Sequence, residues 1–190
     1  MSLVQRPRAG DSDIRFDSGR ALIYAPHPGE VSNIVLTVRL FWGMDGDGET
    51  GNFHPSLEDS LAALQETFPG QDFRYADAVV ARVRANESFE ASGLLAVAGG
   101  DNPLPYSLRA GPLAVSGRPD VGPRTIHLDN LRFGATYRVH QVQRTEVRVK
   151  EAGVRIDVDA PEGQATVIGK TGLGGGYGAL YLVLTAEVLD

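Results

Sequence analysis

Residues 31–42 read VSNIVLTVRLFW, and this stretch decides the fold class of the chain. Its alternate positions carry large apolar side chains, namely Ile34, Leu36, Val38, Leu40 and Trp42. A period of two in β-branched and aromatic residues is typical of a β-strand, because successive side chains of a strand point to opposite faces. The stretch therefore predicts a strand over 31–42, and Arg39 indicates that the second face of this strand is the wetter of the two.

Downstream of this strand the chain offers a helix signal at residues 56–68. Ser56 follows Pro55 and can cap a helix whose third position is Asp59. The apolar residues that follow are spaced by four, three and four positions, and Pro69–Gly70 ends the pattern: Leu57, Leu61, Leu64 and Phe68. We expect about three turns of helix whose leucine stripe packs on an apolar surface.

From Tyr75 onward the period returns to two, and clusters rich in Gly, Pro and Asn interrupt it. We expect strands at 125–131 and 135–142, a hairpin joining 147–150 to 154–158, and a long last strand near 180–188. About eight to ten short strands with a single helix indicate a mainly antiparallel all-β fold. The expected architecture is a single β-sandwich or jelly-roll-like domain.

Length favours one domain, because 190 residues exceed a typical domain of about 150 residues only slightly. Residues 1–19 are polar and lack periodicity, so they are expected to form an extended N-terminal arm. Residues 20–190 are expected to form the β-sandwich or jelly-roll domain, with its helix at about 56–68.

Charge and composition exclude several classes of protein. The formal net charge of −6 lacks the basic footprint of a nucleic-acid binder and gives no attraction to anionic membranes. The absence of cysteine excludes disulfides, thiolate nucleophiles and iron–sulfur clusters. The first 20 residues have no apolar stretch, and the apolar run 179–184 is too short to span a bilayer. We therefore expect a soluble chain without a signal peptide, membrane insertion or nucleic-acid partner.

The glycine-rich segment 169–178 suggests a phosphate-binding loop, but its spacing does not fit. The Lys170–Thr171 pair would need a glycine at position 164, where the chain has Gln164. The residues after Thr171 continue as glycines where the motif requires a helix. A hairpin loop is the interpretation that this segment favours.

The loop at 43–52 carries carboxylates at every second position, at Asp45, Asp47 and Glu49. Oxygen ligands at this spacing are typical of calcium sites. The twelve-residue calcium pattern is incomplete, because Thr50 and Ser56 stand where glycine and glutamate are needed. We interpret the segment as a solvated loop, keep calcium as the alternative, and expect no other cofactor.

The sequence contains residues that could form a histidine-dependent catalytic site, but it contains no recognisable catalytic motif. The four histidines lie on different expected elements, at positions 27, 54, 127 and 140. The serine motif Gly-x-Ser-x-Gly is absent, although Ser107, Ser116 and Asp129 could act with His127. Asp157 and Asp159 share one strand face, which could suit acid–base chemistry but which we interpret as the solvated side of that strand.

Arginines on several expected strands could pair with carboxylates of a second subunit. The candidate interface residues are Arg82, Arg84, Arg138, Arg144 and Arg148. The guanidinium group suits such pairs because its planar fork matches a carboxylate.

Three functional hypotheses follow. The leading one is a non-enzymatic structural subunit of a virion-type capsid, tail or surface array, which self-associates through strand edges, arm and loops. The alternative is a ligand-binding β-module for carbohydrate or calcium that uses loop 43–54 and Trp42. The third is a hydrolase in which His127 or His140 lies beside a serine and a carboxylate in a cleft.

Overall fold

The computed structural model describes residues 14–17, 20–23, 32–44, 54–97, 103–118, 120–140, 147–173 and 178–189. The chain divides into two units, residues 1–31 and 32–190. In the first unit, β1 (Ile14–Asp17) pairs antiparallel with β2 (Arg20–Ile23). The remainder of the expected arm, residues 1–13 and 18–19, lies outside the described residues.

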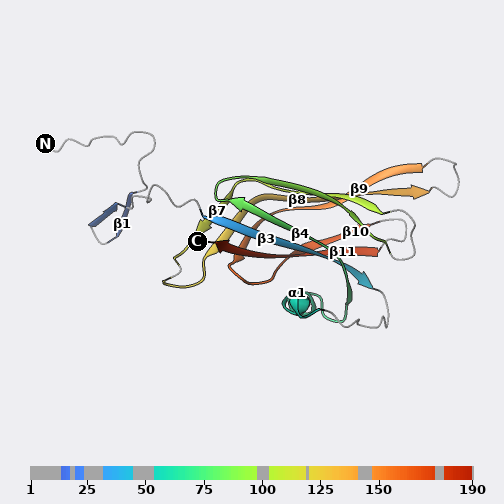
Figure 1. The fold of residues 1–190 in the computed structure, drawn as a ribbon, viewed down its shortest axis with the longest axis horizontal. Helices are drawn as coiled ribbons and strands as arrows, with labels where there is room; N and C mark the ends of the chain where they lie inside the picture. Colours follow the sequence, from blue (N-terminus) through green and yellow to red (C-terminus); the bar gives the residue numbers. More distant parts are fainter. Residues whose placement is uncertain are drawn as a thin grey trace. The chain divides into compact units, whose positions relative to one another are not determined.

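The second unit consists of two antiparallel sheets that face each other (Figure 1). The first sheet has the order β10-β11-β3-β4, with bounds β3 (Asn33–Met44), β4 (Asp72–Arg84), β10 (Thr166–Leu173) and β11 (Gly178–Leu189). The second has the order β5-β6-β8-β7, and β9 pairs with β8 on its other edge. Its bounds are β5 (Phe89–Leu95), β6 (Leu104–Ala110), β7 (Leu113–Ser116), β8 (Thr125–His140) and β9 (Val147–Pro161). The predicted all-β sandwich with one short α-helix is confirmed.

The main core lies between the two sheets, and period-two patterns supply it. The apolar residues predicted from the stretch 31–42 all belong to this core, from Ile34 to Trp42, and each is at most 6% exposed. The second sheet faces them with alternate residues of β8 and β6, such as Leu128 and Leu108. Removal of these side chains from water is the dominant stabilising contribution to such a sandwich.

The helical segment differs from its prediction at the first turn. Residues Pro55–Leu57 form the 3-10 turn η1, and α1 (Glu58–Thr67) follows it. His54 caps this turn, because its Nδ1 accepts a hydrogen bond from the backbone N–H of Ser56. Ser56 is therefore not the cap of the α-helix. Within the described residues, no helix has the length and apolar character that crossing a membrane requires.

The helix α1 covers the outer face of the first sheet, where Figure 1 shows it. Leu64 packs there in a second cluster with Phe41 and Tyr181, all of which are almost fully buried. Arg39 lies under the helix and donates hydrogen bonds to the hydroxyls of Ser60 and Thr185, both at 3.2 Å. This face is the wetter of the two faces of β3, as predicted, because Val35, Thr37 and Arg39 are half-buried whereas the core face is buried; the leucine stripe of α1 covers part of it.

Two expected breaks in the second sheet are also wrong. β8 is one continuous strand that absorbs a register shift between Leu128 and Leu131. β9 runs without a turn through Gly153, which pairs with Gly134 of β8. The long partner strands keep the segments around Leu128–Leu131 and Gly153 paired and extended. The local sequence of each segment does not contain this information.

Candidate functional site: the outer face of the second sheet

Strand pairing places three arginines side by side on the outer face of the second sheet. Arg109 of β6 pairs with Arg132 of β8, which pairs with Arg155 of β9. Side chains of directly opposed residues share one face, with Cβ atoms about 4.5–5.5 Å apart. We call Arg109, Arg132 and Arg155 the arginine row.

A single amide oxygen positions two members of the arginine row. Asn130 Oδ1 accepts from Nε of Arg132 at 3.0 Å and from Nε of Arg155 at 2.8 Å. Asn130 itself has a positive φ of 54° at the register shift of β8, and its backbone N–H donates to Asp157 at 2.7 Å. Asparagine tolerates this conformation better than most residues. The irregularity of β8 thus directs the Asn130 side chain toward two guanidinium groups.

The charges along the row are only partly compensated. Glu90 of β5 forms an ion pair with Arg109, with a 2.7 Å distance between Oε1 and Nη2. Both side chains are about 60% exposed, so water screens this pair. Within the described part of the chain, no carboxylate pairs with Arg132 or Arg155. Among the described residues, these two positive groups therefore share a neutral acceptor, and neither forms an ion pair.

An open hollow of about 400 Å³ lies beside the arginine row. Its floor includes Ser107, Gly134 and Gly153, which occupy opposed positions of β6, β8 and β9. A side chain at Gly134 would lie 2.5 Å from the carboxylate of Glu151, which borders the hollow. The hollow exists because three neighbouring strands carry small residues in one cross-strand row.

A chain of hydrogen bonds joins a serine, a histidine and an aspartate on the same face. Ser116 Oγ lies 2.6 Å from His127 Nε2, and His127 Nδ1 lies 2.5 Å from Asp159 Oδ1. This is the connectivity by which a histidine withdraws a proton from a serine while a carboxylate orients the ring. The His127 and Asp159 side chains are 37% and 74% exposed, so water competes for both interactions.

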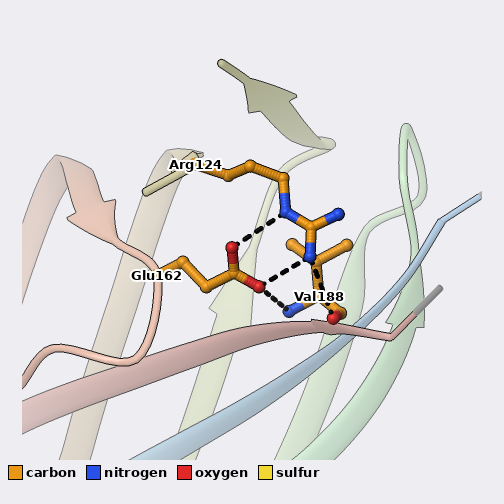
Figure 2. A network of polar contacts seen from close by, with 3 residues as sticks. All are labelled: Arg124, Glu162 and Val188. Atoms are coloured by element: carbon orange, nitrogen blue, oxygen red, sulfur yellow. Dashed lines mark hydrogen bonds and ion pairs between the residues drawn. The ribbon is translucent and has the colours of Figure 1, made fainter. Parts of the chain in front are cut away.

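A polar network at one end of the sandwich ties the two sheets together (Figure 2). Arg124, the residue before β8, donates through Nε and Nη2 to the two carboxylate oxygens of Glu162, both at 2.8 Å. Glu162 Oε1 accepts from the backbone N–H of Val188 in β11 at 3.1 Å, and Arg124 donates to the Val188 carbonyl at 3.3 Å. The hydrogen bonds from Arg124 hold the pKa of Glu162 below its usual value, against the opposing effect of burial.

A second polar contact closes the sandwich at β4. The Tyr106 hydroxyl of β6 donates to Asp77 Oδ2 at 2.8 Å. Asp77 Oδ1 accepts from the backbone N–H of Ala78 at 2.8 Å. Burial raises the pKa of Tyr106, and the bond to Asp77 raises it further. A tyrosine that keeps its proton can remain the donor of this contact between the sheets.

The predicted calcium ligands Asp45, Asp47 and Glu49 lie outside the described residues. The described residues contain no group of three acidic or histidine side chains arranged for a metal ion. Trp42 is only 6% exposed, and its Nε1 donates to the carbonyl of Ala96 at 3.2 Å. It is therefore a core residue and does not present a stacking surface for a sugar.

The predicted interface arginines do not gather at one place. Arg82 and Arg84 are exposed on β4 of the first sheet, whereas Arg138 is exposed on β8 of the second. Arg144 lies outside the described residues, as does the side chain of Arg148 in β9.

The histidines that the structure describes do not converge either. His54 begins the segment that covers the first sheet, and His127 lies on the second sheet. His27 and the side chain of His140 are outside the described residues.

The arginine row could not be predicted from the sequence. Successive members are 23 residues apart, and they become neighbours only through the register of their strands. The period-two pattern can place each arginine on the outer face of its strand, but it cannot show that the three arginines are neighbours. The sequence also offered Ser107, Ser116, His127 and Asp129 as candidate parts of a catalytic group. The register of β8 and β9 instead places Asp159 opposite His127.

No family model matches this chain, and no curated protein does. Among solved structures, the chain is similar to the InvG secretin domain β-barrel from the Salmonella SPI-1 injectisome NC-base, with 10% sequence identity and a TM-score of 0.36. The match covers 84% of this chain and 62% of that one, so this chain spans less than two thirds of its length. At this level of similarity, nothing about the function of that protein is transferred to this chain.

Proposed function

We propose that this chain is a non-enzymatic structural subunit that associates with copies of itself through the free edge of β4, in an assembly such as a virion shell, tail or surface array. The observation that carries the proposal is the unpaired edge of β4 from Val80 to Arg84. Among the described strands, β4 pairs with β3 alone.

The register shows which backbone groups this edge offers. The N–H of Ala85 donates to the carbonyl of Ser32 at 3.0 Å, so this residue pair is hydrogen-bonded. Hydrogen-bonded and non-bonded pairs alternate along an antiparallel ladder. The N–H and C=O groups of Val80 and Arg82, and the N–H of Arg84, therefore point away from β3 without a described partner, whereas the Arg84 carbonyl accepts from the N–H of Glu87 at 3.1 Å. Such a row of unpaired groups is a template for a strand of another chain.

The other half of β4 is closed to pairing. By the same alternation, the N–H of Ala78 also points away from β3, but it donates to its neighbour Asp77. Asp77 is held in turn by Tyr106 of the second sheet. An inward-pointing charge is one way in which proteins close a strand edge. This leaves residues 80–84 as the open segment.

The side chains on the open segment suit an interface. Val80 is 68% exposed, although it is a large apolar residue on a strand. Arg82 and Arg84 are exposed on the same face, and no described carboxylate pairs with them. A chain with a net charge of −6 offers carboxylates on a second copy with which these arginines can pair.

Size-exclusion chromatography with light scattering tests the proposal. The wild-type chain should form oligomers at micromolar concentration. Val80→Lys should shift the population toward monomer, and so should Val80→Pro, because it removes an outward N–H without breaking a bond to β3. Val121→Lys is the matched control, because Val121 is 82% exposed in a turn. A monomeric wild type, or equal dissociation by the control, would contradict the proposal.

A hydrolase is the second candidate, and the Ser116–His127–Asp159 chain favours it. In that case Ser116 Oγ would attack an ester carbonyl while His127 accepts its proton; the ester C–O bond then breaks, the alcohol leaves with that proton, and water hydrolyses the acyl-serine. A fluorophosphonate probe should then label Ser116 in the wild type and fail to label Ser116→Ala or His127→Gln. No labelling of the folded wild type would exclude this candidate.

A further inference from the structure

The hollow beside the arginine row has the features of a binding site for a small anion, separate from the free edge of β4. We propose that it binds a hydroxylated small molecule through a carboxylate or phosphate group, which Arg132 and Arg155 hold.

The two guanidinium groups are already positioned for such a ligand. Each uses Nε to contact Asn130 Oδ1, and no described contact occupies its terminal Nη groups. The shared acceptor fixes the two side chains in neighbouring positions before binding. A side chain that is ordered in advance loses less conformational entropy when a ligand binds.

Electrostatics favour an anion at this position. Two guanidinium groups on opposed residues repel each other, and Asn130 is neutral, so it does not offset their charges. Arg109 is less available, because it is paired with Glu90. A carboxylate or phosphate can accept two hydrogen bonds from one guanidinium group and can also reduce the repulsion between the two.

The shape and the opposite rim indicate the rest of the ligand. A volume of about 400 Å³ falls within the usual range of small-molecule sites. Gly134 and Gly153 separate the arginine row from Glu151, whose carboxylate borders the hollow. The side near Glu151 offers an acceptor, and Ser107 adds a hydroxyl. A molecule with an anionic group at one end and hydroxyl groups at the other fits this arrangement.

Isothermal titration calorimetry at low salt tests this proposal with three probes, which are inorganic phosphate, glucuronate and glucose. Phosphate and glucuronate should bind with millimolar affinity, because the site is open to water, whereas glucose should not bind in the same range. The tighter of the two anions identifies the preferred group. Binding of both anions should weaken as salt is raised.

Paired variants make the result specific. Arg132→Gln/Arg155→Gln should weaken anion binding by about tenfold or more. Arg82→Gln/Arg84→Gln removes the same charge from exposed arginines of the other sheet and should leave binding unchanged. No saturable binding of either anion, or equal loss in both double variants, would overturn the proposal. The control variant alters the β4 edge, whereas the test variant alters only the arginine row. A loss of oligomers can therefore be told apart from a loss of anion binding.

Discussion

The Arg124–Glu162 pair provides a quantitative test of how the two sheets are held together. Arg124→Met removes two charge-assisted hydrogen bonds of 2.8 Å and the 3.3 Å bond to Val188. Breaking one side of a buried ion pair costs about 3–5 kcal/mol. The Glu162 side chain is 22% exposed, so water can solvate part of the carboxylate that loses its partner. We therefore expect the free energy of unfolding to fall by about 3 kcal/mol. In a chain of this length the melting temperature should fall by about 6–12 °C.

The pH dependence of this loss has a definite sign. Arg124 lowers the pKa of Glu162 in the folded state from the usual value of 4.5. A carboxyl group whose pKa is lowered on folding contributes stability above its unfolded pKa and loses that contribution as pH falls through its folded pKa. The difference between the wild type and Arg124→Met should therefore be constant above about pH 5 and shrink below pH 4.5.

Urea denaturation can measure both effects, because the single Trp42 is buried in the core and its fluorescence reports unfolding. Arg109→Met is the matched control, since it breaks an ion pair whose partners are about 60% exposed. Its cost should stay below about 1 kcal/mol. A loss below about 1 kcal/mol for Arg124→Met at pH 7, or a loss that is the same at pH 7 and pH 3.5, would refute this account of the contact.

Three further substitutions test individual contacts by the same denaturation assay. Tyr106→Phe should cost about 1 kcal/mol, because it removes the hydrogen bond to Asp77; an unchanged midpoint would mean that the bond adds nothing. Leu64→Ala should cost about 3 kcal/mol by leaving a cavity under α1, and a cost below 1 kcal/mol would show that the helix is not docked as described. Gly153→Ala should cost at least about 2 kcal/mol, because its Cβ would lie 2.1 Å from the Phe133 carbonyl oxygen; full stability would contradict this close approach of β8 and β9.

The stretch 31–42 illustrates how far local patterns could predict this fold. Its alternating apolar residues correctly predicted a strand and the residues of its core face, because a period of two is a local property of the chain. The same stretch also correctly indicated that the Arg39 face is the wetter of the two, but it did not show what covers part of that face. The helix that covers part of this face and contacts Arg39 is supplied by a segment about 20 residues away, so the strand's own pattern carries no sign of it.

The candidate sites depended on tertiary structure for a similar reason. His127 and Ser116 could be named as candidates from the sequence, with Asp129 as a candidate carboxylate, but the register places Asp159 opposite His127. The arginine row was not predicted, because three isolated arginines become neighbours only when β6, β8 and β9 pair in one register. The expected turns at the breaks in β8 and β9 were wrong because the paired strands hold both segments extended.

By itself, the sequence determined that this chain forms antiparallel strands around an apolar core with one amphipathic helix, because side-chain periodicity sets which residues can leave water together. Only the tertiary structure decided which strand edge stays open, which charges meet across strands and where a hollow forms. Those features depend on register, and a shift of one residue would move every side chain of a strand to the opposite face.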